Sequence, residues 1–406
     1  MNEEKKLVPK LRFPEFRRAE GWEMTLLEKC LGYQQPTPYL VKDERYSPIF
    51  KTPVLTAGKT FILGYTNEEH GIFREGLPVI IFDDFTTATQ FVDFPFKAKS
   101  SAMKILLAKD GANIKFMFET LRNVSFEVGA HERHWISTFA PMLVPIPKTA
   151  EQQKIADCLS SLDELIAAQA RKVDALKTHK KGLMQQLFPR EGETQPRLRF
   201  SEFRDAGEWH DAQMGTLLVS SPDYGVNAAA VPFSENLPKY LRITDISEDG
   251  RYLPEKQVSV DLEATDGNYL DDGDIVLART GASVGKSYQY RKQDGKLVFA
   301  GFLIRVKPHP KKVVSTYLAN YLTSGHFWKW VAVTSARSGQ PGINSTEYSS
   351  LTVPLPPTLS EQQSIASCLS GLDTLITTAT QELDTLKTHK KGLMQQLFPS
   401  AEAVEA

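Results

Sequence analysis

Residues 281–287 (GASVGKS) come closer to a nucleotide-binding motif than any other part of this sequence. A phosphate-binding P-loop has four residues between its glycines, and its lysine leads into a helix. Here three residues separate Gly281 from Gly285, and residues 288–292 have the character of a strand or loop. These departures argue against nucleotide binding. We predict instead a hairpin-like turn that carries hydrogen-bond donors, namely Arg279, Thr280, Ser283, Lys286 and Tyr288.

Three other patterns that suggest catalysis are each incomplete. Residues 221–224 (SPDY) lack the second proline of a methyltransferase loop that grips a target amine, and no methyl-donor glycine loop accompanies them. His131 and His134 have no third metal ligand in register. Asp83 and Asp84 follow an apolar run, but no acid-x-lysine completes a nuclease pattern. We therefore expect no catalysis, no metal and no cofactor in this chain.

Polar side chains suited to DNA occur in loop-like stretches of both halves of the chain. Arg and Lys can pair with guanine and Gln with adenine, while hydroxyl groups reach phosphates and base edges. Besides the turn residues above, the candidates are Gln34, Thr37, Tyr39, Thr86, Thr87, Lys97, Lys99, Arg133, His134, Arg242, Thr244, Arg337 and Gln340. Each one taken singly is also explained as part of a solvated loop or turn, so these residues are candidates only.

The charge of the chain is nearly balanced, with 48 Lys and Arg against 49 Asp and Glu. No global basic field therefore indicates a nucleic-acid partner. The distribution is uneven, since residues 244–274 hold ten acids and two bases whereas residues 279–312 hold nine bases and one acid. One module thus carries two stretches of opposite charge.

Length and composition indicate several ordinary globular modules. The 406 residues suggest about three domains at roughly 100 to 200 residues each. No apolar run approaches the roughly 18 to 20 residues of a membrane span, and residues 1–10 are charged. Cys30, Cys158 and Cys368 are too few and scattered for a disulfide framework. We expect a cytoplasmic protein with reduced thiols.

An internal repeat dominates the organisation of the chain. Residues 151–189 return as residues 361–399 with 27 of 39 positions identical, including the whole of the last 14 (LKTHKKGLMQQLFP). The segments VPIP and VPLP precede the two copies. A weaker repeat opens each half, LRFPEFR at residue 11 and LRFSEFR at residue 198, and a tryptophan follows each, Trp22 and Trp209. Such repetition indicates one structural role used twice.

Apolar residues in the repeated segment step by four and three, which predicts a long helix with a heptad seam. Some 36 helical residues span about 54 Å. Gln169 with Lys180 and Ala379 with Lys390 interrupt the two seams at matching positions. The predicted seam residues are Ile155, Leu159, Leu162, Ile166, Val173, Leu176, Leu183, Leu187, Ile365, Leu369, Leu372, Ile376, Leu383, Leu386, Leu393 and Leu397.

Between the helices the sequence predicts mostly β globules with some helix, an α+β fold. Strands are predicted at residues 78–82, 104–107, 274–278 and 301–306, and short helices at 114–121 and 315–322. The predicted order is a globule (1–147), a long helix (148–190), a second globule (191–357), a second helix (358–399) and a tail (400–406). The two globules share little sequence beyond their edges, which indicates similar frames with different contents.

These features together resemble the specificity subunit of type I restriction-modification enzymes. The resemblance rests on the order of globules and helices, on the VPIP or VPLP and EQQ openings of each helix, and on residues 273–286 (GDIVLARTGASVGK). Gly339 with Gln340, and Ile343 with Asn344, also fit that family. The first globule departs from the pattern, because it has PVIIFDDF at residues 78–85 in place of the GDIVLA phrase.

The resemblance implies two target recognition domains, each of which reads one half of a split DNA site. It implies that the helices pair as an antiparallel coiled coil with pseudo-two-fold symmetry, set the gap between half-sites and dock two methyltransferase subunits. S-adenosylmethionine would belong to those subunits, and ATP and Mg²⁺ to the translocating and cleaving subunits that join them. The alternatives are a coiled-coil protein adaptor without DNA sequence specificity and a free-standing nuclease or ATPase.

Overall fold

Both long helices predicted from the repeat are present. The computed structural model describes residues 7–58, 60–124, 133–263, 265–337 and 339–399. Helix α3 is Thr149–Leu187 and helix α7 is Leu359–Leu397. The chain divides into unit 1, which is Met1–Ala170 with Gln381–Ala406, and unit 2, which is Arg171–Thr380. Each long helix therefore contributes one segment to each unit.

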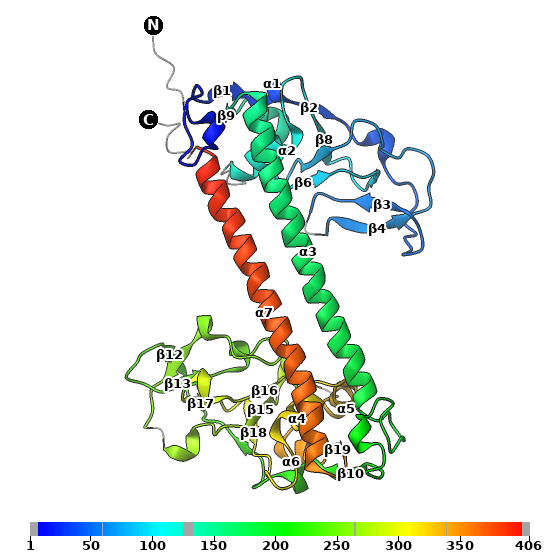
Figure 1. Ribbon diagram of the computed structural model, residues 1–406, viewed down its shortest axis with the longest axis vertical. Helices are drawn as coiled ribbons and strands as arrows, with labels where there is room; N and C mark the ends of the chain where they lie inside the picture. Colours follow the sequence, from blue (N-terminus) through cyan, green and yellow to red (C-terminus); the bar gives the residue numbers. More distant parts are fainter. Residues whose placement is uncertain (1–6, 59, 125–132, 264, 338, 400–406) are drawn as a thin grey trace. The chain divides into compact units, whose positions relative to one another are not determined.

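Unit 1 is built from three sheets in its described part (Figure 1). A two-stranded sheet pairs β1 (Glu23–Leu26) with β9 (Leu143–Ile146). A four-stranded antiparallel sheet has the order β2-β8-β5-β6, with β2 (Leu31–Gln34), β8 (Met103–Ala108), β5 (Val79–Asp83) and β6 (Thr89–Val92). The third sheet, β4-β3-β7, joins β4 (Ile62–Thr66), β3 (Thr52–Leu55) and β7 (Lys97–Ala98), and β3 pairs with β7 in parallel. Its helices are α1 (Leu27–Cys30) and α2 (Ile114–Asn123).

Unit 2 repeats this arrangement with different residues. Its sheets are β10 (His210–Gln213) with β19 (Thr352–Leu355), then β11-β18-β15-β16, then β12-β14-β13-β17. The remaining strands are β11 (Asp223–Tyr224), β12 (Ala230–Pro232), β13 (Lys239–Leu241), β14 (Val258–Val260), β15 (Ile275–Ala278), β16 (Ser287–Gln289), β17 (Leu297–Phe299) and β18 (Leu303–Val306). Helices α4 (Ser315–Tyr321), α5 (Gly325–Thr334) and α6 (Ser345–Ser349) complete the unit.

Strand order establishes which elements of the two units correspond. The order β2-β8-β5-β6 matches β11-β18-β15-β16, and the parallel pair β3 with β7 matches the parallel pair β13 with β17. Only β12 lacks a counterpart among the described strands. The predicted strands and short helices are confirmed, and the prediction of similar frames with different contents agrees with this topology.

Each central sheet has two buried faces because side chains alternate along a strand. In β5, Ile80 and Phe82 belong to a core with α2 and the long helices, whereas Val79 and Ile81 pack with β3 and β7. The same alternation occurs along β15 of unit 2. Each unit is therefore layered as helices, central sheet and second sheet.

The weak N-terminal repeat and the strong helical repeat meet at one buried glutamate in each unit. Arg12 donates two hydrogen bonds of 2.7 Å to Glu151, and Trp22 Nε1 donates to the same carboxylate at 3.3 Å. In unit 2, Arg199 and Trp209 make the same contacts to Glu361. A bidentate pair of this kind fixes direction as well as distance. The repeated residues thus form the same frame in each unit, built from Arg12, Trp22 and Glu151 in unit 1 and from Arg199, Trp209 and Glu361 in unit 2.

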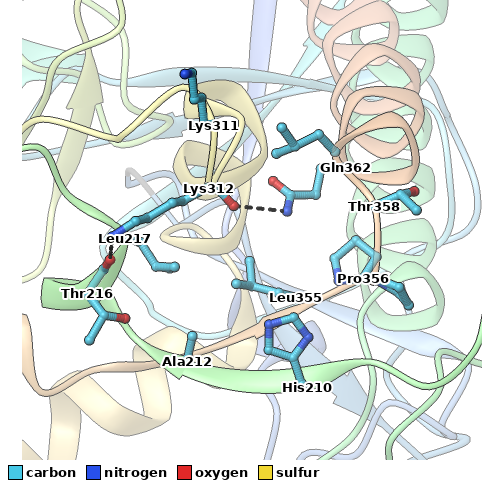
Figure 2. A pocket seen from close by; sticks show the side chains of 12 residues that line it. His210, Ala212, Thr216, Leu217, Lys311, Lys312, Leu355, Pro356, Thr358 and Gln362 are labelled. Carbon is cyan, nitrogen blue, oxygen red and sulfur yellow. Dashed lines mark hydrogen bonds between the residues drawn. The ribbon is translucent and has the colours of Figure 1, made fainter.

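The glutamine that follows each glutamate fastens the start of the long helix to its globule. Gln152 Oε1 accepts from Asn113 N at 2.9 Å, and Gln362 Oε1 accepts from Val314 N at 2.8 Å. Figure 2 shows Gln362 in a pocket of about 420 Å³, where its Nε2 donates to Lys312 O and where Lys312 Nζ donates to Thr216 O. These polar groups bind the chain's own carbonyls, so this pocket is part of the frame.

The predicted seam residues are all buried or half-buried. Within unit 1, Asp163 of α3 pairs with Lys390 of α7, and Gln169 donates to Glu382. From residue 163 to residue 169 of α3, the contacted residue on α7 goes from 390 back to 382, so the two segments run antiparallel. Within unit 2, Lys180 pairs with Asp373 at 2.7 Å. Two of the polar seam interruptions are therefore ion-paired lysines.

The end of each long helix contacts the segment that begins one of the weak N-terminal repeats. In unit 1 the Leu11 amide donates to Gln396 O at 2.9 Å, and in unit 2 the Leu198 amide donates to Gln186 O at 2.9 Å. Phe398 then stacks on Phe116, with ring centroids 5.3 Å apart.

Candidate nucleic-acid interface

The β15–β16 turn of unit 2 packs against the loop that precedes α6. The Gly281 amide donates to Pro341 O at 3.0 Å, and the Ile343 amide donates to Arg279 O at 2.9 Å. Gly281 has φ +73° and Gly285 has φ +88°, conformations that glycine adopts readily. A Cβ at Gly281 would lie 3.2 Å from Gln340 Nε2. The structure thus brings the predicted residues Arg279, Thr280, Ser283, Arg337 and Gln340 onto two adjoining loops.

Arg279 is half-buried, and its Nη1 donates a long hydrogen bond of 3.5 Å to Gly301 O. Its guanidinium lies over the Tyr224 ring, 4.7 Å from the centroid, and it makes no ion pair with any residue that the structure describes. Tyr224 is held by Ser345, whose side chain and backbone hydrogen bonds lower the pKa of the phenol. Phe302, whose carbonyl accepts from the Arg279 amide, is 61% exposed. Cations interleaved with aromatic rings on rigid loops suit phosphates and bases.

Arg337 is already paired within this corner. Both Glu347 oxygens accept from Arg337 Nη2, at 2.6 and 2.7 Å. A hydrogen bond from the Asn344 amide and the Arg337 pair lower the pKa of Glu347 despite some desolvation. Glu347 also completes a capping box at α6. The structural turn role that the sequence left open for this loop is therefore present, and Arg337 has fewer free donors than Arg279.

Several other predicted residues of unit 2 are engaged inside the unit. Arg242 forms hydrogen bonds of 2.8 and 3.0 Å to Asp245, while Thr244 is exposed. Lys286 pairs with Glu248 at 2.8 Å and donates to Ile246 O. The prediction that Tyr288 presents its hydroxyl from the turn is wrong. Burial first, and its hydrogen bond to Asp294 second, raise the pKa of Tyr288 far above its ordinary value.

Opposite charges in residues 244–274 and 279–312 pair with each other. Arg305 lies 3.7 Å from Asp274, and Lys307 lies 3.1 Å from Asp271. With Lys286 and its partner Glu248, three of the nine bases are paired in this way, so fewer cations are available to a binding partner.

Hydrogen bonds identify Asp84 as the counterpart of Arg279 in unit 1. The Asp84 amide donates to Ala102 O at 3.0 Å, and the His134 amide donates to Asp84 O at 2.9 Å. Arg279 makes both contacts with the corresponding backbone of unit 2. Asp84, however, is buried and pairs with buried Lys104 at 3.3 Å. The same frame position therefore carries a half-buried arginine with no ion pair to any described residue in unit 2, and a buried ion pair in unit 1.

The β5–β6 turn of unit 1 presents Thr86 and Thr87 instead. Asp83 Oδ1 accepts from the amides of Phe85 and Thr86, both at 2.9 Å. Thr87 has φ +58°, which is unusual for a β-branched residue. Strain of this kind is often retained at a functional site. Thr86 is exposed and Thr87 is half-buried.

The other candidates of unit 1 divide between surface and interior. Gln34 Nε2 donates to Tyr39 OH at 2.9 Å, Thr37 is exposed, and Lys99 pairs with Glu44. Arg133 is exposed, whereas His131 lies outside the described residues. Two predictions are wrong in their surface placement. The Lys97 side chain is 2% exposed, pairs with Glu68 at 3.0 Å and donates to His70 O, and His134 is buried against the β5–β6 turn.

The sequence is similar to known proteins of one family. Residues 227–388 match the type I restriction modification DNA specificity domain. The specificity subunit of the Escherichia coli type I restriction enzyme EcoR124I/EcoR124II is 32% identical over 395 residues, which cover 89% of this chain and 92% of that protein. This chain belongs to the family of type I restriction enzyme specificity subunits.

Two further relatives agree with that assignment. The MjaVIII specificity subunit of Methanocaldococcus jannaschii is 26% identical over 404 residues, covering 94% of this chain and 93% of that protein. The crystal structure of the type I restriction-modification S subunit from M. genitalium has the same fold, with TM-score 0.66, 15% identity and coverage of 97% and 100%. The predicted family and fold class are confirmed.

Several features of this specificity subunit escaped sequence reasoning. Tyr224 and Phe302 were missed because only strand pairing brings them beside Arg279. The rejection of a P-loop is confirmed, since Ser287 begins strand β16. In the described part of the specificity subunit, no three His, Cys, Asp or Glu side chains gather as a metal site. None of its described helices is long and apolar enough to cross a bilayer.

Proposed function

We propose that this specificity subunit reads a split DNA site, one half with each unit, through the β5–β6 turn of unit 1 and the β15–β16 turn of unit 2. The observation that carries the proposal is the pair of equivalent frame positions occupied by Asp84 and Arg279. Corresponding frames give the two turns equivalent positions within their own units, while their different side chains would recognise different bases. Direct readout depends on such differences among donors and acceptors.

The residues proposed to face DNA are those that remain exposed or half-exposed at these turns. In unit 2 they are Arg279, Thr280, Ser283, Gln340 and, newly, Tyr224 and Phe302. In unit 1 they are Thr86, Thr87 and Arg133. Lys97, His134 and Tyr288 are excluded by burial, and Arg337 contributes through its support of the α6 loop.

The long helices are proposed to dock methyltransferase subunits, one at each copy of the repeat. Leu165 of α3 is 57% exposed and its repeat equivalent on α7, Leu375, is 54% exposed. Both lie outside the seam, and matching exposed leucines on identical frames suit two copies of one partner. S-adenosylmethionine would be bound by those subunits, and ATP with Mg²⁺ by the translocating and cleaving subunits. This chain would supply specificity and no catalytic group.

The experiment is to co-express the chain with its methyltransferase subunit in a host without adenine methylation. Single-molecule sequencing then maps methyladenine across the genome. One two-part motif with a fixed gap is the expected result. An unmodified genome despite a stable, folded complex would overturn the proposal and favour the protein-adaptor alternative.

A further inference from the structure

A groove of about 960 Å³ lies within unit 2 between the last turns of α3, the segment that follows α3, the loop at residues 248–251 and the start of α5. Seven lysines and arginines line it against four acids. The basic residues are Lys177, Lys180, Lys181, Arg190, Arg251, Lys286 and Lys329, and the acids are Glu191, Glu248, Asp249 and Asp373. The groove is therefore a local concentration of positive charge in a chain whose net charge is −1.

Internal pairing accounts for three of these cations. Lys180 pairs with Asp373 at 2.7 Å, Arg251 with Asp249 at 3.0 Å and Lys286 with Glu248 at 2.8 Å. Burial alone would raise the pKa of Asp249, but a hydrogen bond from Ser247 and the charges of Arg251 and Lys177 together lower it below its ordinary value. Three of the four acids of the groove are thus paired with Lys180, Arg251 and Lys286.

Of the remaining four cations, Lys177 is close enough to Asp249 to influence its pKa, and the other three are exposed cations from three different segments. Lys181 lies on α3, Arg190 lies just after it and Lys329 lies on α5. None of the three has an ion pair or side-chain hydrogen bond with a residue that the structure describes. Three exposed cations at one groove raise the local positive potential, which favours an anionic ligand. The arrangement fits a linear, repeated anion better than a single acidic side chain.

The groove continues the surface of the β15–β16 turn. Lys286, at the end of that turn, lines the groove, and Gly285 packs directly on α5, where a Cβ would lie 2.8 Å from Val331 Cγ2 and 3.2 Å from Trp328 Cζ3. Trp328 is itself 44% exposed at the groove. DNA that rests on the turn would therefore lie beside this groove and its exposed cations.

We propose that this groove binds the phosphate backbone of the DNA next to the half-site read by unit 2, with Lys181, Arg190 and Lys329 as the contacts. The inference rests on the proposed function and extends it from the reading turn to the long helix. These contacts carry no base information, because phosphates are the same in every sequence. They add affinity and fix the register of unit 2 on the duplex.

The test titrates the complex of this chain with its methyltransferase subunit against two labelled duplexes, one with the mapped site and one scrambled, at several salt concentrations. Each lost phosphate contact lowers the slope of log affinity against log salt by about 0.9 and weakens binding about five-fold at about 0.15 M salt. We expect Lys181→Ala combined with Lys329→Ala to lower the slope by roughly two on both duplexes. Lys311→Ala, at an exposed lysine of unit 2 outside this groove, is the matched control and should leave the slope unchanged.

Three outcomes would overturn the inference. They are an unchanged salt slope in the double variant, a loss confined to the specific duplex, and a loss of methyltransferase association with unchanged DNA binding, which would indicate an acidic protein surface. A wild-type complex that does not distinguish the duplexes would refute the proposed function, but the slope on either duplex would still decide the groove. Equal thermal unfolding temperatures of all variants establish that the fold is intact.

Discussion

Lys390 and Asp163 form an ion pair with Nζ 2.7 Å from Oδ1 in unit 1, and the residues at the same repeat positions, Lys180 and Asp373, form the same pair in unit 2. The two pairs differ in their surroundings. Lys390 also lies 3.0 Å from Glu119, whose side chain is fully buried, whereas no acid other than Asp373 is paired with Lys180 among the described residues. The lysine at this repeat position therefore pairs with two acids in unit 1 and with one acid in unit 2.

Lys390→Ala should destabilise the protein more than Lys180→Ala. Removing Lys390 leaves a buried carboxylate with fewer partners, at roughly 3 kcal/mol. Removing Lys180 breaks a partly exposed pair, at roughly 1 kcal/mol or less. Hydrogen exchange resolves the two units, and protection should fall in unit 1 for the first variant and little in unit 2 for the second. Equal losses would refute the buried-network explanation.

Acid should weaken unit 1 through Asp163. Burial alone would raise its pKa, but hydrogen bonds from Lys115 and Lys390 hold the pKa of Asp163 below its ordinary value. A lowered folded-state pKa gives stability that is complete above the unfolded pKa, about 3.9, and is lost as pH falls through the folded pKa. Asp163→Asn should therefore cost roughly 1 to 2 kcal/mol near neutral pH. The difference from wild type should shrink below about pH 4, as measured by denaturant unfolding across pH.

Arg279→Ala should change one half of the methylation motif only. Loss of a guanidinium contact to a base or phosphate is worth about 1 to 3 kcal/mol. The half-site read by unit 2 should be relaxed or weakly methylated, while the half read by unit 1 stays intact as an internal control. Methyladenine mapping of the variant measures both halves in one experiment. A change in the half-site read by unit 1, or no change in either half-site, would contradict the assignment of the turn.

Lys104→Met should unfold the reading turn of unit 1. The substitution leaves Asp84 buried without its cation, at roughly 3 to 5 kcal/mol. Adding Asp84→Asn removes the stranded charge, so the double variant should recover much of that loss. Thermal unfolding with both single variants and the double variant forms a cycle that isolates the pair. A double variant as unstable as Lys104→Met would show that packing dominates.

Lengthening both long helices by one heptad should widen the gap between half-sites. Seven residues inserted after Ala170 and after Thr380, the last residues before the unit boundary on each helix, preserve the heptad spacing and add about 10 Å. That length corresponds to about three base pairs at 3.4 Å each. Both half-sites should be unchanged in the methylation motif. A motif with its original gap would contradict the spacer role.

Local sequence pattern was sufficient for the helices and the longer strands. Heptad spacing and near-identity of the two copies gave α3 and α7, and apolar runs gave β5, β8, β15 and β18. The shorter strands were not predicted, because three or four residues such as those of β13 carry too little periodicity. The parallel pairs β3 with β7 and β13 with β17 depend on contacts between distant segments.

The candidate site was predictable in part for the same physical reason. Residue type indicated which side chains can bind DNA, and the Arg279 turn was found in this way. The direction in which a side chain points cannot be seen in the sequence. Lys97 and Tyr288 were therefore assigned to the surface, although Lys97 pairs with Glu68 and Tyr288 with Asp294 inside the protein. Only the fold reveals that an ammonium or phenol group is already satisfied.

The carbonyls of Gln396 and Gln186, which accept from the amides of Leu11 and Leu198, give the polypeptide the connectivity of a ring. In unit 2 the two residues are near neighbours along the chain, whereas in unit 1 they lie at its opposite ends, yet the local geometry is the same. A circularly permuted gene, opened in the segment that follows α3 and joined across the Leu11–Gln396 contact, would encode the same set of neighbours. We therefore expect the permuted chain to fold into the same two units, with the order of the two halves reversed.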